Sequence, residues 1–171
     1  MEEYPLNFLN WLEATDGGKF IFTMLVSMIP VAELRVGLPF GVGLGLPYWK
    51  AFAAAVLGNI IPAPFIIVYI RRIFHWLRTC FPKLDGFVTS LENKARRKSD
   101  SVVKYDTLGL LLFVGIPLPG TGVWTGCLVA AMLDMQLKRA MPSVIAGVIM
   151  AGLIMTGLTH VGINLFTTVM G

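Results

Sequence analysis

Residues 20–47, FIFTMLVSMIPVAELRVGLPFGVGLGLP, form an apolar stretch that is broken in the middle, and this stretch decides the fold. One helix across a bilayer needs about 20 apolar residues, so two crossings need about 40. The stretch is interrupted by Pro30 and Pro39 and carries Glu33 and Arg35 at its centre. Non-helical backbone at membrane depth is tolerated only inside protein or along a watery cavity. We therefore predict a re-entrant hairpin with its tip near residues 30–35, and a single bent span is the alternative.

A second broken apolar stretch, residues 107–136, matches the first at an offset of 87 residues. Ile29-Pro30 aligns with Ile116-Pro117, and each stretch is followed by one long apolar segment. Two broken hairpins, each followed by an apolar helix, are typical of a duplicated membrane transporter. At the same offset Gly37 meets Trp124, Pro39 meets Gly126 and Leu46 meets Leu133.

The composition indicates an integral membrane protein. Of the 171 residues, 56% are hydrophobic and 14% are charged, whereas a soluble domain carries about 25% charged residues. This chain lacks the polar residues to cover a water-facing surface, so we expect one all-α membrane domain over residues 1–171. The first residues lack the basic start of a signal peptide, so no removable leader is expected. The basic residues cluster beside apolar segments, which argues against a nucleic-acid partner.

The chain divides into six predicted elements, read from apolar runs, prolines and charges. They are an interfacial helix at 4–16 ended by Gly17-Gly18, re-entrant hairpin 1 at 20–47, a transmembrane helix at 48–70 kinked by Pro62 and Pro64 and stopped by Arg71-Arg72, a cytoplasmic amphipathic segment at 73–106, re-entrant hairpin 2 at 107–136, and a transmembrane helix at 141–168.

The positive charges predict the orientation of these elements. Nine of the fourteen lysines and arginines lie within residues 71–104, and two more follow at 138 and 139. Positive residues favour the cytoplasmic side, so residues 71–106 and 134–140 are expected to be cytoplasmic in a multi-pass protein of the inner or plasma membrane. Hairpin 1 then enters from outside and hairpin 2 from inside, which makes the fold an inverted repeat of hairpin plus helix.

Glu33 and Arg35 are the charged residues deepest within an apolar segment. A charge at the bilayer centre costs at least about 2.5–3.5 kcal/mol, and such residues usually face a cavity and serve a function. Arg35 offers two parallel donors to a phosphate or carboxylate. Glu33 in a partly dry cavity is readily protonated, so we assign it to substrate binding and proton coupling. The alternative is a mutually neutralising pair that locks the tip, with Glu33 holding Arg35.

The second tip carries no charge but offers backbone N–H groups, hydroxyls and an indole. Glycines there let backbone approach a ligand or the other hairpin, and helix N-termini favour anions. The two tips are predicted to meet near the midplane; close packing without a ligand is an equal alternative for the second tip. The candidate substrate-binding residues outside the first tip are Gly120, Thr121, Gly122, Trp124, Thr125 and, in the first span, Asn59.

The remaining polar residues are less specific. Asp134 and Arg139 flank the second hairpin and are either helix end caps or a gate. Cys80 and Cys127 are expected to be free thiols, because they lack the spacing of metal ligands. The sequence shows no catalytic triad, phosphate-binding loop or metal-ligand spacing. We therefore predict no catalytic residues, no metal, no cofactor and no enzyme activity.

Two strings carry a resemblance to a known family: IPVAELRVGLPFGVGLGLPYWKAFAAAVLGNIIP at residues 29–62 and FVGIPLPGTGVWTG at residues 113–126. They resemble the small multidrug export proteins, and the likeness covers about residues 20 to 165. That family is similar to the DedA (VTT-domain) membrane proteins, which implies paired re-entrant hairpins. The wider group is linked to transbilayer movement of polyprenyl phosphate carriers and to proton-dependent drug tolerance.

The resemblance places Glu33 where the wider group has a membrane-embedded acid in its first hairpin. The second hairpin departs from the pattern, because DedA proteins carry arginines around that tip. This chain has no arginine between Asp106 and Lys138, and its embedded arginine is Arg35 on the first hairpin.

Three functions follow from the sequence. The first is a proton-linked transporter that moves an anionic amphiphile such as a polyprenyl phosphate lipid, with Arg35 holding the phosphate and Glu33 coupling to protons. The second is proton-coupled efflux of cationic lipophilic drugs, with Glu33 as the binding charge. The third is a membrane scaffold that docks partners through residues 73–106. Membrane lipids and a second copy of the chain, forming a homodimer, are the expected partners.

Overall fold

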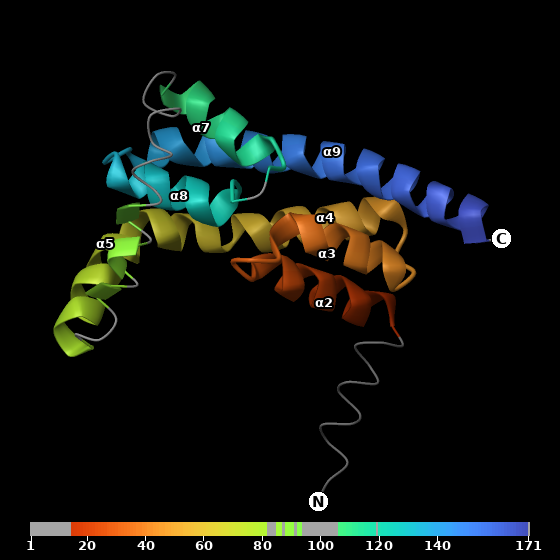
Figure 1. Cartoon of the computed structure of the whole chain (residues 1–171), viewed down its shortest axis with the longest axis horizontal. Coiled ribbons are helices and arrows are strands. Elements are labelled where there is room, and N and C mark those ends of the chain that lie inside the picture. Colours follow the sequence, from red (N-terminus) through yellow and green to blue (C-terminus); the bar gives the residue numbers. More distant parts are fainter. Residues whose placement is uncertain are drawn as a thin grey trace, which may run out of the picture. The chain divides into compact units, whose positions relative to one another are not determined.

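The computed structural model describes residues 15–81, 106–118 and 120–170, with short pieces at 85–86, 88–90 and 92–93. All regular elements within these residues are helices, which confirms the all-α prediction (Figure 1). The chain divides into two compact units, unit 1 (Met1–Asn59 and Ala151–Gly171) and unit 2 (Ile60–Met150). The predicted interfacial helix at 4–16 lies outside the described residues except for its last two.

Unit 1 begins with a helical hairpin formed by α2 (Asp16–Met28) and α3 (Glu33–Gly43), which lie side by side (Figure 1). The side chain of Thr15 caps α2 by accepting the N–H of Gly18 at 3.0 Å. The predicted break at Gly17-Gly18 is therefore wrong, because both glycines lie in the first turn of a capped helix. The turn at residues 29–32 agrees with the predicted tip.

The first predicted span consists of two consecutive helices, α4 (Tyr48–Ile60) and α5 (Pro62–Cys80). They are separated at Ile61, because Pro62 has no N–H to continue the ladder and fits best at the first position of a new helix. Residues Tyr48–Ile70 are long and apolar enough to cross a membrane. The apolar span ends before Arg71-Arg72, as predicted, although the helix itself continues to Cys80, since arginine is a good helix former.

Unit 2 contains a second helical hairpin, formed by α7 (Asp106–Gly115) and α8 (Val123–Met132), which contact each other (Figure 1). Helix α8 also packs against α5. The last helix, α9 (Leu137–Met170), begins four residues before the predicted start of the second span. Its segment Leu137–Leu165 is the second stretch long and apolar enough to cross a membrane.

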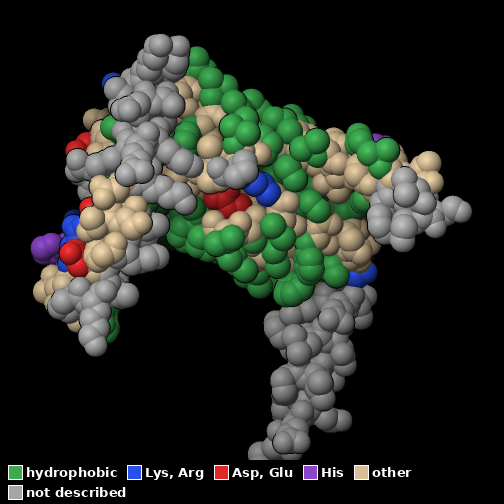
Figure 2. Space-filling model, viewed as in Figure 1, with side chains coloured by type: hydrophobic (Ala, Val, Ile, Leu, Met, Phe, Trp, Pro, Cys, Tyr) green, Lys and Arg blue, Asp and Glu red, His purple; other side chains and the backbone are tan. Residues whose placement is uncertain are grey.

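Arg78 of α5 bonds to three described residues that follow the helix in the segment 73–106. Its guanidinium donates to Asp85 and to Glu92, each at 2.8 Å, and to the hydroxyl of Thr89 at 3.3 Å. These carboxylates raise the pKa of Arg78 above its usual range, Glu92 having the larger effect. Figure 2 shows charged and histidine side chains gathered at this end of α5, whereas hydrophobic side chains cover the face over α2 and α3.

The two hairpins end in the same backbone hydrogen bonds, shifted by 89 residues. Each helix closes in a Schellman motif, with a left-handed residue just beyond its last turn, and the next helix begins with the same two bonds. The left-handed residues are Gly45 (φ 86°) and Asp134 (φ 55°). The donor–acceptor pairs are Gly45–Val42, Leu46–Gly41, Lys50–Pro47 and Ala51–Pro47 in the first repeat, and Asp134–Ala131, Met135–Ala130, Arg139–Gln136 and Ala140–Gln136 in the second.

Glycines pack the three helices of each repeat in the same way. A methyl group on Gly58 of α4 would overlap the carbonyl oxygen of Met24 and lie 2.9 Å from Ser27 Cβ. A methyl group on Gly147 of α9 would lie 2.8 Å from both the carbonyl oxygen of Leu111 and Val114 Cβ. Small residues at these positions let the helices approach closely.

The register of the repeat therefore differs from the predicted one after the tips. The helices α2 and α7 correspond at the predicted offset of 87, which matches Ser27 with Val114. The following helices correspond at 89, because the second tip is longer. Gly37 thus corresponds to Gly126 rather than Trp124, and Leu46 to Met135 rather than Leu133.

Candidate functional site

Glu33 is a buried acid in a strained backbone conformation. Its exposed fraction is 6%, and its φ of 48° lies in the left-handed region that favours glycine. It is the first residue of α3, and its N–H donates to the carbonyl oxygen of Ile29 at 2.9 Å. The left-handed conformation costs about 1–2 kcal/mol in a residue with a side chain.

The second repeat has a glycine at the position of Glu33. Gly122 lies 89 residues further along, directly before α8, with a φ of 135°. Backbone strain in non-glycine residues concentrates at functional sites, because it survives only where the surrounding structure enforces it. The first repeat thus keeps an acid where the fold itself favours glycine.

Arg35 lies on the first turn of α3 and is half-buried. Its guanidinium is partly desolvated, and the negative charge of Glu33 is close enough to act on it. The sequence required a backbone turn for such a pair, because residues two apart on a helix do not face each other. The left-handed conformation of Glu33 provides that backbone turn. Apolar side chains near Arg35 in the chain are exposed: the exposed fraction is 93% for Val31 and 50% for Val36.

Asn59 is buried on α4, with an exposed fraction of 3%. In the amide orientation that pairs both polar atoms, its nitrogen donates to the carbonyl oxygen of Ser27 at 2.8 Å. Its oxygen accepts the N–H of Leu34 at 3.3 Å. The carboxamide therefore contacts the backbone on both sides of the first tip. We predicted Asn59 as substrate-binding, and these bonds give it a structural contact that the sequence did not indicate.

Ser27 is a site residue that the sequence reading missed. Its side chain is fully buried, and its hydroxyl donates to the carbonyl oxygen of Thr23 at 2.8 Å. A methyl group on Gly37 would overlap its hydroxyl oxygen, and a methyl group on Gly58 would lie 2.9 Å from its Cβ. The recurrence of these two glycines 89 residues later, as Gly126 and Gly147, is the signal in the sequence that could have identified this seam.

The second tip is fastened by Thr121. Its hydroxyl accepts the N–H of Leu118 at 3.2 Å and lies 2.9 Å from the carbonyl oxygens of Ile116 and Leu118, to which it can donate. These contacts all join Thr121 to residues of the same tip. The other predicted residues are Gly120, exposed with a φ of 78°; Gly122, buried; and Trp124 and Thr125, half-buried on the first turn of α8.

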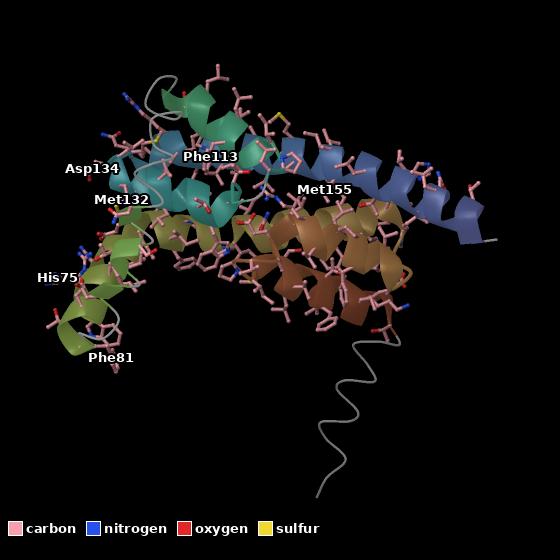
Figure 3. All side chains as sticks on the ribbon, viewed as in Figure 1. His75, Phe81, Phe113, Met132, Asp134 and Met155 are labelled. Atoms are coloured by element: carbon pink, nitrogen blue, oxygen red, sulfur yellow. The ribbon has the colours of Figure 1, made fainter. Side chains whose placement is uncertain are left out.

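Asp134 lies just beyond the C-terminal end of α8, close to Met132 (Figure 3). It is exposed and holds the left-handed position of the Schellman motif, and Arg139 is exposed on the first turn of α9. The end-cap alternative explains Asp134 directly, because aspartate tolerates this conformation better than most residues.

Replacing Asp134 with glycine is expected to raise the free energy of unfolding by up to about 1 kcal/mol, because glycine adopts a left-handed φ without strain. Transport should be unchanged. Thermal unfolding in detergent and an export assay would check both. Loss of transport in a stable Asp134→Gly protein would instead support the gate.

The predicted site residues fall in different units. Glu33, Arg35 and Asn59 belong to unit 1, whereas the second tip, Asp134 and Arg139 belong to unit 2. That the two tips meet at one site stays a prediction. Among the described residues, no group of three or more histidine, cysteine, aspartate or glutamate side chains could hold a metal ion. Both cysteines are free thiols, Cys80 exposed and Cys127 buried.

Comparison with protein families matches residues 33–154 to the family described as "Putative small multi-drug export protein". The search of curated proteins gives no match, and neither does the search of solved structures. The matched region begins at the buried acid and covers α3, α4 and the whole of unit 2, so it includes every site residue predicted from the sequence, but not Ser27. The resemblance seen in the sequence is confirmed, and the chain belongs to the small multi-drug export protein family.

Proposed function

We propose that this protein is a proton-linked membrane exporter in which Glu33 is the proton-binding group. One observation carries the proposal: a buried carboxylate occupies a left-handed backbone position that the second repeat gives to glycine. Desolvation and backbone strain both make an acid unfavourable at this position, so we infer that the acid is kept for its function. The family description supports export as the activity.

The lengths of the hairpin helices support re-entry from one side of the membrane. At 1.5 Å per residue, the 13 residues of α2 and the 11 of α3 measure about 20 Å and about 17 Å. The hydrocarbon core is about 30 Å thick, so neither helix is long enough to cross it. Helices α7 and α8, with 10 residues each, are shorter still. We propose that both hairpins are re-entrant.

The charge distribution supports an inverted arrangement of the two repeats in the inner or plasma membrane. The described basic residues Arg72 and Arg78 follow the first span, and Lys138 and Arg139 lie at the start of the second. We place all four in the cytoplasm. Lys19 and Asp16 lie at the start of α2, and Lys50 lies at the start of α4, which is the other end of the first span. Lys50 donates to Asp16 at 2.6 Å, and this hydrogen bond holds the pKa of Asp16 below its ordinary value.

For the substrate we favour an anionic amphiphile, such as a polyprenyl phosphate lipid. Arg35 is half-buried, whereas Glu33 is buried, so the charge more open to a ligand at this tip is the cation. A guanidinium binds phosphate through two parallel hydrogen bonds and keeps its charge at membrane depth. The apolar side chains around the tip suit a hydrocarbon tail.

A second candidate is efflux of cationic lipophilic drugs; the family description names multi-drug export without giving the charge of the substrate. In that case Glu33 would bind the drug cation and exchange it for a proton. The two candidates differ in the sign of the charge on the substrate, and this difference can be tested directly.

Replacing Arg35 with glutamine is expected to lower export of a fluorescent isoprenyl phosphate from proteoliposomes at least tenfold. The reason is that a neutral amide loses the charge and one half of the bidentate contact. Export of ethidium should stay unchanged or rise. If isoprenyl phosphate export is unaffected while Glu33→Gln abolishes ethidium export, the substrate is cationic and the first candidate is wrong.

A further inference from the structure

We infer that Asn59 is a positioning residue that holds Glu33 in its left-handed conformation. The inference deepens the proposed function, since it assumes that Glu33 is the proton-binding group. It rests on the two hydrogen bonds of the Asn59 carboxamide and on the comparison of the two repeats.

The carboxamide joins the two backbone groups that a broken helix leaves without partners. The carbonyl oxygen of Ser27 is among the last four of α2, and the N–H of Leu34 is among the first four of α3. Asn59 pairs with the first at 2.8 Å and with the second at 3.3 Å. Because Leu34 directly follows Glu33, fixing its N–H restricts the backbone rotation that sets the conformation of Glu33.

The second repeat lacks the carboxamide of Asn59 and the hydroxyl of Ser27 at the corresponding positions, although the backbone groups are the same. Val148 takes the place of Asn59 and is fully buried, and Val114 takes the place of Ser27 with an exposed fraction of 2%. Valine thus fills this position on the neighbouring helix when packing is the sole requirement. The amide occurs in the repeat whose strained residue has a side chain, and is absent where Gly122 adopts a positive φ at no steric cost.

The consequence is a division of roles within the first tip. Glu33 binds the proton, and Asn59 sets where its carboxylate lies and how readily it is protonated. A loosened tip would let the carboxylate move toward water, where the charged form is more stable. Substitution at Asn59 is therefore expected to shift the pH at which transport is half-maximal toward lower pH.

A double-mutant thermal cycle with Asn59→Val and Glu33→Gly tests the positioning contact without any transport measurement. Asn59→Val should lower the melting temperature by roughly 5 °C in the wild-type background. In the Glu33→Gly background the loss should be less than half as large, because glycine needs no restraint. The matched control is Val148→Ala at the counterpart position, whose effect should be equal in both backgrounds.

Transport supplies the second readout. Asn59→Val should shift the pH of half-maximal isoprenyl phosphate or ethidium export by at least half a pH unit, and Asn59→Gln, which keeps the carboxamide, should restore most of the wild-type profile. Equal thermal losses in the two backgrounds would overturn the inference, as would an unshifted profile. If Glu33→Gly still exports with a normal pH profile, the proposed function fails, and the thermal cycle alone decides whether Asn59 restrains the tip.

Discussion

Glu33→Gly should be more stable than Glu33→Ala by about 1–2 kcal/mol, and neither protein should export substrate. Both variants remove the carboxylate and the Cγ methylene and differ only in the Cβ, so the difference in their stability isolates the backbone strain at a φ of 48°. Alanine retains the Cβ that makes the left-handed region unfavourable, and glycine does not. For a domain of this size the difference corresponds to roughly 2–8 °C in melting temperature.

A neighbouring position on the same helix gives the control for this result. Val36 lies on the regular part of α3 and is half-exposed. There glycine should be less stable than alanine by about 1 kcal/mol, because glycine disfavours the helix interior. If alanine is also the more stable residue at position 33, the strained conformation is wrong. If Glu33→Gly and Glu33→Ala both export normally, the acid has no role in transport.

Gly58→Ala should destabilise the protein by about 3 kcal/mol or more, although a single methyl group is added. The new Cβ would overlap the carbonyl oxygen of Met24 and lie 3.0 Å from its carbonyl carbon. Backbone atoms cannot rotate away as a flexible side chain can, so α2 must separate from α4. Thermal unfolding of the purified protein in detergent measures the loss.

Two other glycines make this prediction specific. Gly157→Ala on α9 should be neutral or slightly stabilising, since nothing lies within 4 Å of the added methyl group. Gly147→Ala, at the counterpart of Gly58, should also be destabilising, because its methyl group would lie 2.8 Å from the carbonyl oxygen of Leu111. Equal stabilities for Gly58→Ala and Gly157→Ala would contradict the packing described for both repeats.

The sequence predicted the fold well where composition and length decide it. Broken apolar stretches of 28 and 30 residues, at 20–47 and 107–136, each became two short helices because neither can hold two full spans. Pro30 lies in the turn between α2 and α3, whereas Pro62, predicted to kink one helix, begins a new one. Arg71-Arg72 marked the end of the apolar span but not the end of the helix, because arginine does not interrupt the backbone ladder of α5.

The repeat register and the role of Asn59 required three-dimensional contacts. The proline pairs fixed an offset of 87, but a longer second tip shifts everything after it to 89. An offset that changes inside a loop is invisible to a single alignment of the two halves. Glu33 and Arg35 stood out in the sequence because charge is rare in apolar segments. Ser27 did not, since a serine that bonds to its own helix leaves no pattern of its own, and only the repeated spacing of the glycines that pack on it indicates its position.

Glu33 is proposed to be the group that couples transport to protons. The direct measurement uses proteoliposomes with the pH dye pyranine trapped inside, and whichever of isoprenyl phosphate or ethidium the wild-type protein exports. Wild-type protein should change the internal pH as the probe moves. Glu33→Gln keeps the shape and the strained backbone but carries no titratable carboxyl, and it should leave the internal pH constant. Proton movement at the wild-type rate in Glu33→Gln would contradict the account.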